Sequence, residues 1–239
     1  MNRTNVLACK PSLFTRRAGC LSLAAIATAA TGLVSAQSLP SPSSPPSEKP
    51  TMKSIEAPAT HREVSRRTVN IDADTAVLTR YERKDRRNAG LEGEHFSTVV
   101  AADGTLKGFA NISLDLVGKP LPSRERTEQI ARAFLQQTAP DLLPRMKISW
   151  IEPHDEPIRV QREGRTETVT LTGMKVKARN LADGRWFWVI VGSDQTPMVF
   201  ERDIVWINFP GHRKTEKWLH DSWLKQQADV TQQVEAKSA

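Results

Sequence analysis

The sequence predicts an α+β domain, with a largely antiparallel β-sheet built from hairpins and two helices packed on it. Short segments in which apolar and polar residues alternate recur along the chain, and turn signals such as Asp103-Gly104 separate them. Two other segments, at about 124–138 and 213–225, show the 3.6-residue spacing of amphipathic helices. We therefore expect one sheet with helices on a face.

The first 36 residues have the layout of a cleavable secretory signal. Basic residues precede an apolar stretch from Leu21 to Val34, which is shorter than the roughly 20 residues that a membrane-spanning helix needs. Small residues ending at Ala36 suit a cleavage site. Arg16 and Arg17 fit a twin-arginine export signal, and an ordinary secretory signal that holds two arginines explains them equally well. Either route predicts a periplasmic or secreted protein whose mature chain has no transmembrane segment.

Cleavage after Ala36 changes what the composition implies. It removes four of the 34 lysines and arginines and none of the 27 acidic residues, so the formal net charge falls from +7 to +3. A charge this small gives no reason to expect a nucleic-acid partner. Both cysteines, Cys9 and Cys20, lie in the signal, so we expect no disulfide, no thiolate nucleophile and no cysteine-held metal. No cofactor is expected.

The mature chain divides into three parts. Proline and serine dominate residues 37–60, a composition typical of an extended, disordered linker. Residues 61–225 hold nearly all of the patterned segments and are long enough for a single α+β domain. Residues 226–239 are polar and lack aromatic residues, which predicts a tail.

Strands are expected wherever alternation is clear. Asp103-Gly104 predicts a type I′ hairpin turn, and the segment from Pro153 to Pro157 predicts a turn between two strands. The expected strands are 66–71, 76–82, 95–101, 105–116, 146–152, 158–162, 166–179, 185–191 and 197–207.

The first helix has clear boundaries. Ser123 is a suitable N-cap, and Pro140 ends the helical pattern. The second helix, 213–225, is expected to place Trp218 and Trp223 near one side.

Common catalytic motifs are missing, so single residues must be weighed. His154, Asp155 and Glu156 could supply an imidazole and two carboxylates, although a solvent-exposed turn explains the same residues. Glu94 and His95 are adjacent in a strand and are expected to face opposite sides. His220-Asp221 is set aside because adjacent helical residues do not face each other, and the basic segment 80–87 is interpreted as a solvated loop.

Tryptophan is concentrated in the last 90 residues. In the segment 185–191, Trp186 and Trp188 share one face of a strand whose other face is also apolar. Such a strand is either central and covered on both sides, or exposes one face for binding. If it binds, Trp186, Trp188 and Trp206 are the expected anchors.

Residues 96–140 contain a strand pair around Asp103-Gly104, the connector GKPLPS and the helix RERTEQIARAFLQQTAP. This arrangement resembles the PepSY-type domains of exported bacterial proteins, although Thr127 stands where alanine is usual. The resemblance implies a non-catalytic module of the bacterial envelope that binds or restrains partners, and it carries over no catalytic residue.

Two functions follow from these observations. The first is an exported, non-catalytic envelope or periplasmic protein that binds or regulates a protein or a small envelope ligand. The alternative is a hydrolase-like enzyme acting on envelope material through His154 with Asp155 or Glu156, or through His95 with Glu94. The alternative requires a pocket in which such side chains converge with perturbed pKa values.

Overall fold

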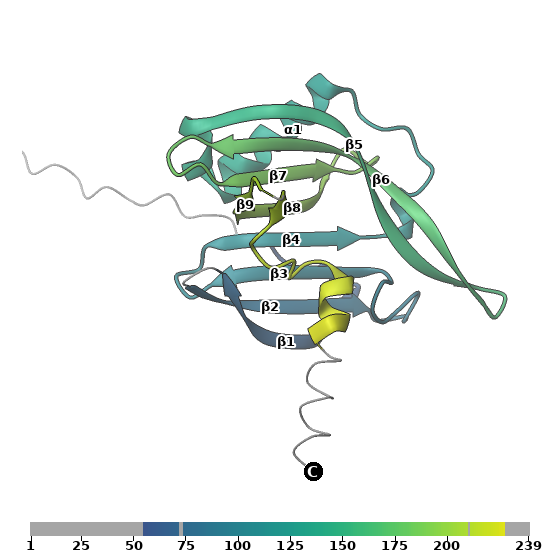
Figure 1. Cartoon of the computed structure of the whole chain (residues 1–239). Coiled ribbons are helices and arrows are strands. Elements are labelled where there is room, and N and C mark those ends of the chain that lie inside the picture. The colour runs from purple at the N-terminus through teal and green to yellow at the C-terminus, as the bar shows by residue number, and fades with distance from the viewer. Residues whose placement is uncertain (1–54, 72–73, 210, 228–239) are drawn as a thin grey trace, which may run out of the picture. The chain divides into compact units, whose positions relative to one another are not determined.

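The computed structural model describes residues 55–71, 74–209 and 211–227. Eight antiparallel strands form one sheet in the order β1-β2-β3-β4-β8-β7-β6-β5, and β9 and β10 form a small separate pair (Figure 1). The strands are β1 (His61–Ile71), β2 (Asp74–Arg83), β3 (His95–Ala101), β4 (Leu106–Ile112), β5 (Met146–Arg162), β6 (Arg165–Asn180), β7 (Trp186–Val191), β8 (Pro197–Ile204), β9 (Trp206–Ile207) and β10 (His212–Arg213). The predicted α+β class with an antiparallel sheet is confirmed.

The helical elements are few. The α-helix α1 (Arg124–Thr138) follows β4, and two 3-10 helices, η1 (Leu114–Leu116) and η2 (Pro140–Arg145), flank it. A further helix covers residues 221–227, the last described residues. In the described part of the chain, no helix combines the length and the apolar character required to cross a lipid bilayer.

The sheet consists of two four-stranded meanders, β1 to β4 and β5 to β8. They meet where β4 pairs with β8 over three residue pairs, from Gly108↔Glu201 to Ala110↔Val199. A helix follows each meander, α1 after the first and residues 221–227 after the second. The junction therefore brings residues about 90 positions apart in the sequence into register.

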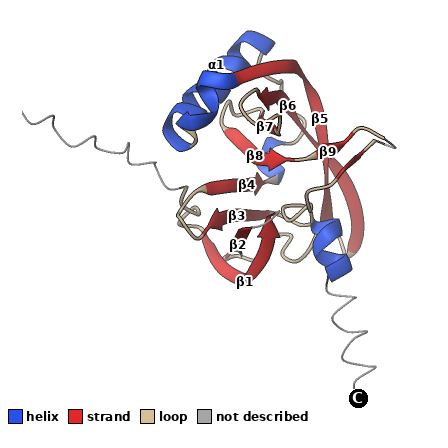
Figure 2. Cartoon of the chain, turned by 60° about the vertical axis from the view of Figure 1, so that its left-hand side comes forward, coloured by secondary structure: helices blue, strands red, loops and turns tan. Residues whose placement is uncertain are grey.

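One face of the sheet, which we call the helix face, packs against α1 (Figure 2). The N-cap is Ser123, as predicted, and its hydroxyl accepts a hydrogen bond from the Arg126 backbone N–H at 3.2 Å. Leu135 of α1 is fully buried, and four phenylalanines form a chain of ring contacts on this face. The ring pairs are Phe96–Phe109, Phe109–Phe134 and Phe134–Phe200, with centroids 5.3–6.2 Å apart.

The opposite face, which we call the arm face, is covered by two segments of the chain. Strands β5 and β6 extend past β7, because β7 pairs with β6 only between Met174 and Arg179. This extension, the arm (residues 156–171), buries Ile158 and Val160 against strands of the first meander. The backbone N–H of Arg159 donates to the carbonyl of Glu92 at 2.7 Å, which ties the arm to the segment between β2 and β3.

The C-terminal segment, residues 214–227, is the second cover of the arm face. Trp218 is completely buried there, with Leu219 and Leu224 beside it. Gly108 of β4 permits this packing: a Cβ atom at that position would lie 2.9 Å from Leu219 Cδ1 and 3.2 Å from Trp218 Cζ3. β7 is therefore a central strand covered on both faces, one of the two predicted alternatives for 185–191.

Three of the strand predictions are wrong in detail. The strand expected over 197–207 is divided between β8 and β9, which belong to different sheets. The turn expected from Pro153 to Pro157 does not exist, because β5 runs unbroken from Met146 to Arg162. β5 lies at the edge of the sheet, where some backbone positions face away from the neighbouring strand. A proline at such a position costs no sheet hydrogen bond, because an N–H there would have no partner strand. The strand expected over 105–116 ends at Ile112, where Ser113 caps the short helix η1.

The hairpin expected at Asp103-Gly104 is present, but the turn type is different. Only Gly104 has a positive φ, of 84°, and a bulge lies in the ladder beside it. Type I′ geometry needs two consecutive positive φ angles. That pattern occurs at Glu163-Gly164, with φ of 50° and 75°, at the tip of the arm.

The second predicted helix begins later than expected. Residues 213–220 are not helical, and the helix starts at 221. Arg213 instead pairs with Trp206 in the small sheet, and its guanidinium lies 2.6 Å from Glu201. The amphipathic pattern of 213–225 is thus overridden by tertiary contacts. The predicted signal 1–36, residues 37–54 of the predicted linker and residues 228–239 of the predicted tail lie outside the described residues.

Candidate functional site

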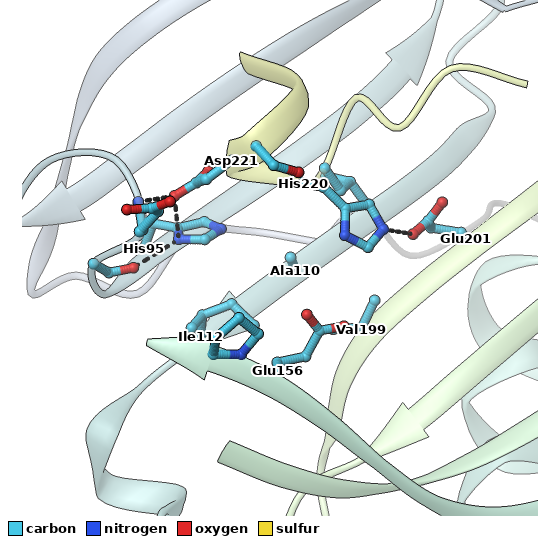
Figure 3. A pocket seen from close by; sticks show the side chains of 13 residues that line it. His95, Ala110, Ile112, Glu156, Val199, Glu201, His220 and Asp221 are labelled. Atoms are coloured by element: carbon cyan, nitrogen blue, oxygen red, sulfur yellow. Dashed lines mark hydrogen bonds and ion pairs between the residues drawn. The ribbon is translucent and has the colours of Figure 1, made fainter. Parts of the chain in front are cut away.

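A pocket with a volume of about 130 Å³ lies on the arm face, which we call the arm-face pocket (Figure 3). Its walls come from β3, β4 and β8, the arm, the residues before β3 and the C-terminal segment. The lining comprises the acidic residues Glu92, Glu156, Glu201 and Asp221, the histidines His95 and His220, the apolar residues Ala110, Ile112, Pro157, Val199 and Leu219, and Gly93 and Ser222.

His95, the first residue of β3, is held in one tautomer. Its Nδ1 lies 3.0 Å from the carbonyl oxygen of Gly93, which can only accept, so Nδ1 carries the proton. The other ring nitrogen, Nε2, is buried and has no hydrogen-bond partner. Figure 3 shows the ring turned so that this nitrogen faces the interior of the pocket. Nε2 of His95 is therefore a hydrogen-bond acceptor that faces the cavity and has no donor.

The environment of His95 keeps its ring neutral. Burial lowers its pKa to about 4, and the positive charge of Arg80 acts in the same direction, while Asp221 opposes it. The side chain is only 6% exposed, and Asp221 Oδ2 lies 4.0 Å from Nδ1. At neutral pH the ring is therefore uncharged, and Nε2 offers a lone pair.

A buried ion pair closes the end of the pocket next to His95. Arg80 of β2 binds Asp221 through two contacts, Nη1 to Oδ1 at 2.6 Å and Nη2 to Oδ2 at 3.1 Å. The backbone N–H of Glu92 also donates to Asp221 Oδ2. Both charged side chains are less than a tenth exposed. The pair attaches the start of the C-terminal helix to the second strand.

The other end of the pocket is ionic as well. Glu201 of β8 is almost fully buried, which alone would raise its pKa. A hydrogen bond from His220 and the charge of Arg213 outweigh this and lower its pKa to about 2. Its carboxylate oxygens lie 2.6 Å from Arg213 Nη2 and 3.4 Å from His220 Nε2. Glu201 is therefore ionised and already has partners.

Lys175 of β6 lies near this cluster without lining the pocket. Burial lowers its pKa to about 8, although the charges of Glu201 and Glu156 oppose the shift. Its ammonium group lies 4.2 Å from the ring centroid of Trp188. A cation over an indole face is stabilised by the quadrupole of the ring, which here helps to hold a partly desolvated lysine.

The three residues of the predicted polar site, His154, Asp155 and Glu156, lie on two different faces of β5. Asp155 accepts a hydrogen bond from the Thr172 hydroxyl at 2.7 Å, whereas His154 Nε2 lies 3.2 Å from Glu156 Oε1. Of the three, only Glu156 lines the arm-face pocket. Alternation along the strand explains the separation, since residues i and i+2 share a face and residue i+1 does not.

Trp186, Trp188 and Trp206 all contact cations of the chain itself. Lys177 Nζ lies 4.7 Å from the Trp186 centroid and 5.5 Å from that of Trp206. Trp188 is 7% exposed and contacts both Lys175 and Arg213, whereas Trp206 is 44% exposed. Their use as anchors for a partner stays a prediction, with Trp206 the most accessible of the three.

His95 and Glu94 do face opposite sides. Glu94 accepts hydrogen bonds from the Arg87 side chain at 2.7 and 2.8 Å and from the Leu114 backbone N–H at 2.9 Å, on the side away from His95. The basic segment 80–87 is more than a solvated loop, because Arg80 is buried against Asp221 and Arg87 binds Glu94.

Several ionic residues in or next to the pocket were not predicted as site residues: Arg80, Glu92, Glu201, Arg213, His220 and Asp221. Two of them, His220 and Asp221, had been set aside. Arg80 and Asp221 are 141 positions apart, so no local pattern links them. Glu201 did carry a signal, because a charged residue inside a strongly apolar strand must find partners if it is buried. In the described part of the chain, no three His, Cys, Asp or Glu residues are arranged to hold a metal ion.

No family model matches the chain, and no match was found among curated proteins or solved structures. The resemblance of residues 96–140 to PepSY-type domains therefore stays a prediction.

Proposed function

We propose that this chain is an exported, non-catalytic binding protein and that the arm-face pocket is its ligand site. One observation carries the proposal: the buried Nε2 of His95 faces the cavity as an acceptor that no group of the protein satisfies. A buried polar atom without a partner is costly, and proteins rarely retain one unless a ligand or water completes it.

The chemistry of the pocket favours binding over catalysis. A general base works best when its pKa lies near the working pH, and a His95 ring with a pKa of about 4 is a weak base at neutral pH. Of the acid–base residues considered for the hydrolase alternative, His154 and Glu156 lie 3.2 Å apart, but only Glu156 lines the pocket, and Asp155 is on the opposite face of β5. A neutral, preorganised acceptor is suited to holding a ligand.

The binding proposal is tested by NMR screening of the mature protein against a library of small neutral and charged compounds. We expect the bound compounds to shift the resonances of the His95 ring and of the Ile112 methyl groups. Binding should weaken in Ala110→Val, which adds two methyl groups to the pocket floor, and persist in Ala101→Val, the same change outside the lining. Compounds that bind without moving pocket resonances, or no binding at all, would refute the proposal.

Export is tested separately. The full chain, expressed in a bacterium with a C-terminal epitope tag, should appear outside the cytoplasm with Gln37 as its first residue. Recovery of the uncleaved chain from the cytoplasm alone would contradict the export proposal and leave the binding proposal intact.

A further inference from the structure

The size of the arm-face pocket limits its ligand. The pocket volume is about 130 Å³. A cavity of about 150 Å³ in an engineered protein interior is large enough to bind benzene. A compound with one six-membered ring, or a branched aliphatic compound of that size, therefore fits, and a larger ligand would have to protrude into solvent.

The walls of the pocket indicate an apolar body for the ligand. Ala110 and Ile112 of β4, Val199 of β8 and Leu219 of the C-terminal segment contribute apolar side chains from two sides. Each of these residues is less than a tenth exposed in the folded chain. A flat or compact apolar group placed between them would remove the remaining apolar wall surface from water.

The carboxylates of the pocket already have partners within the protein. Glu92 lies 2.6 Å from Lys225 Nζ, and Glu156 pairs with His154. Asp221 is held by Arg80, and Glu201 by Arg213 and His220. A charged ligand would have to compete with one of these pairs, whereas a neutral ligand leaves them all in place.

His95 adds one polar requirement. With Nδ1 bound to the Gly93 carbonyl, the ring can only accept at Nε2. An O–H or N–H donor on the ligand would satisfy that atom, whereas an ether oxygen or a carbonyl could not.

From these four constraints, and resting on the proposed function, we infer that the arm-face pocket binds a neutral compound of single-ring size, such as a phenol, whose one O–H or N–H group donates to Nε2 of His95. The apolar part of the ligand lies between Ile112, Val199 and Leu219, and Asp221 and Glu201, at the two ends of the pocket, keep their own partners.

The test uses five probes that differ in one property each: phenol, anisole, toluene, benzoate and benzylammonium. Each is titrated at pH 7 into the mature protein labelled with ¹⁵N and ¹³C, with the His95 Nε2 and Ile112 methyl resonances followed by NMR. Phenol should bind about tenfold more tightly than anisole or toluene, the affinity that one neutral hydrogen bond supplies. Phenol should also move the Nε2 resonance, and the two charged probes should bind more weakly than phenol.

A variant checks the acceptor. In His95→Leu, phenol should lose its advantage over anisole, because no acceptor remains. If that variant does not fold, the Nε2 resonance of the unmodified protein still reports whether the phenol hydroxyl donates to it.

The contrary outcomes are distinct. Equal affinity for phenol, anisole and toluene, with an unmoved Nε2 resonance, would refute the inference that the ligand donates a hydrogen bond to His95. The proposal that the pocket binds a ligand would still stand. Tighter binding of benzoate or benzylammonium than of phenol would refute the inference that the ligand is neutral, but the pocket would still be a ligand site. If no probe moves the pocket resonances, water completes Nε2, and both this inference and the proposed function fail.

Discussion

The two faces of the sheet are built on different principles. The helix face is closed by α1 over a cluster of apolar side chains in which four phenylalanine rings touch in sequence. The arm face also contains an apolar cluster, but Arg80, His95, Glu201 and Asp221 are buried in or beside it, and a cavity remains. Two segments distant in sequence, the arm and the C-terminal segment, cover it.

This difference suits the helix face to stabilising the fold and the arm face to holding a ligand. The apolar cluster under α1 gains from close contact and tolerates no space. A face that buries ions needs each of them paired, and the pairs hold the covering segments at fixed positions around a cavity. The arm face is therefore where a functional site is expected, and each prediction below compares it with another part of the molecule.

The largest effect is expected from breaking the buried ion pair of the arm face. Arg80→Met leaves Asp221 buried without its partner, which should lower the free energy of unfolding by about 4 kcal/mol. Urea denaturation measures it. Arg66→Met is the matched control, because Arg66 pairs with Glu63 on an exposed surface, where solvent screens an ion pair and its contribution to stability is small. Equal losses in the two variants would show that Arg80 is not effectively buried.

A leucine on each face gives the second comparison. Leu135→Ala removes a fully buried side chain under α1 and leaves a closed cavity, which should cost about 3 kcal/mol. Leu219→Ala enlarges a pocket that solvent already reaches, so its cost should be lower, at about 2 kcal/mol. The same denaturation measurement ranks them, and the reverse order would mean that the arm face is the more tightly packed.

The pH dependence of stability should arise largely from the arm face. The pKa of His95 is about 4 in the folded chain and about 6.5 when unfolded. At pH values between these two, the unfolded chain therefore binds more protons than the folded chain. Stability then rises with pH and is lost as pH falls through this window, by about 2 kcal/mol between pH 7 and pH 5. Burial is the main cause of the lowered His95 pKa, the charge of Arg80 adds to it, and Asp221 and Glu82 oppose it.

Removing the buried imidazole should flatten this dependence. His95→Gln is expected to show little change in unfolding free energy between pH 7 and pH 5, whereas His154→Gln, a change at a partly exposed histidine, should keep the slope. Unfolding curves at both pH values measure it. An unchanged slope in His95→Gln would assign the dependence to another group. Below about pH 4.5 a further loss is expected as Glu201, whose pKa is lowered to about 2, becomes protonated in the unfolded chain.

The smallest effect is expected at the tryptophans of the arm face. Lys177 lies within 5.5 Å of the ring centroids of Trp150, Trp186 and Trp206. Lys177→Met should lower the free energy of unfolding by about 1 kcal/mol through lost cation–π attraction. Lys119→Met, at an exposed position, should change it by less than about 0.5 kcal/mol. No difference between the two would mean that the ring contacts contribute nothing to stability.

Local sequence determined most of the elements of this protein. Ser123 and Pro140 bound α1 because a hydroxyl can cap the first turn and a proline cannot continue a helix. Alternation of apolar and polar residues located the strands of both meanders, because the period of two is a property of the extended backbone. The same pattern predicted that the strand containing Trp186 and Trp188 is apolar on both faces, which fits its central position.

Only the tertiary structure decided the rest. Pro153 and Pro157 predict a turn, yet they lie within a strand because β5 is at the edge of the sheet. Residues 213–220 show a helical pattern, but Arg213 is held by Glu201 and Trp218 is buried over Gly108. The pocket depends on pairs such as Arg80 and Asp221, far apart in the chain, which local patterns cannot link. Propensity acts over a few residues, whereas burial and charge pairing act through space.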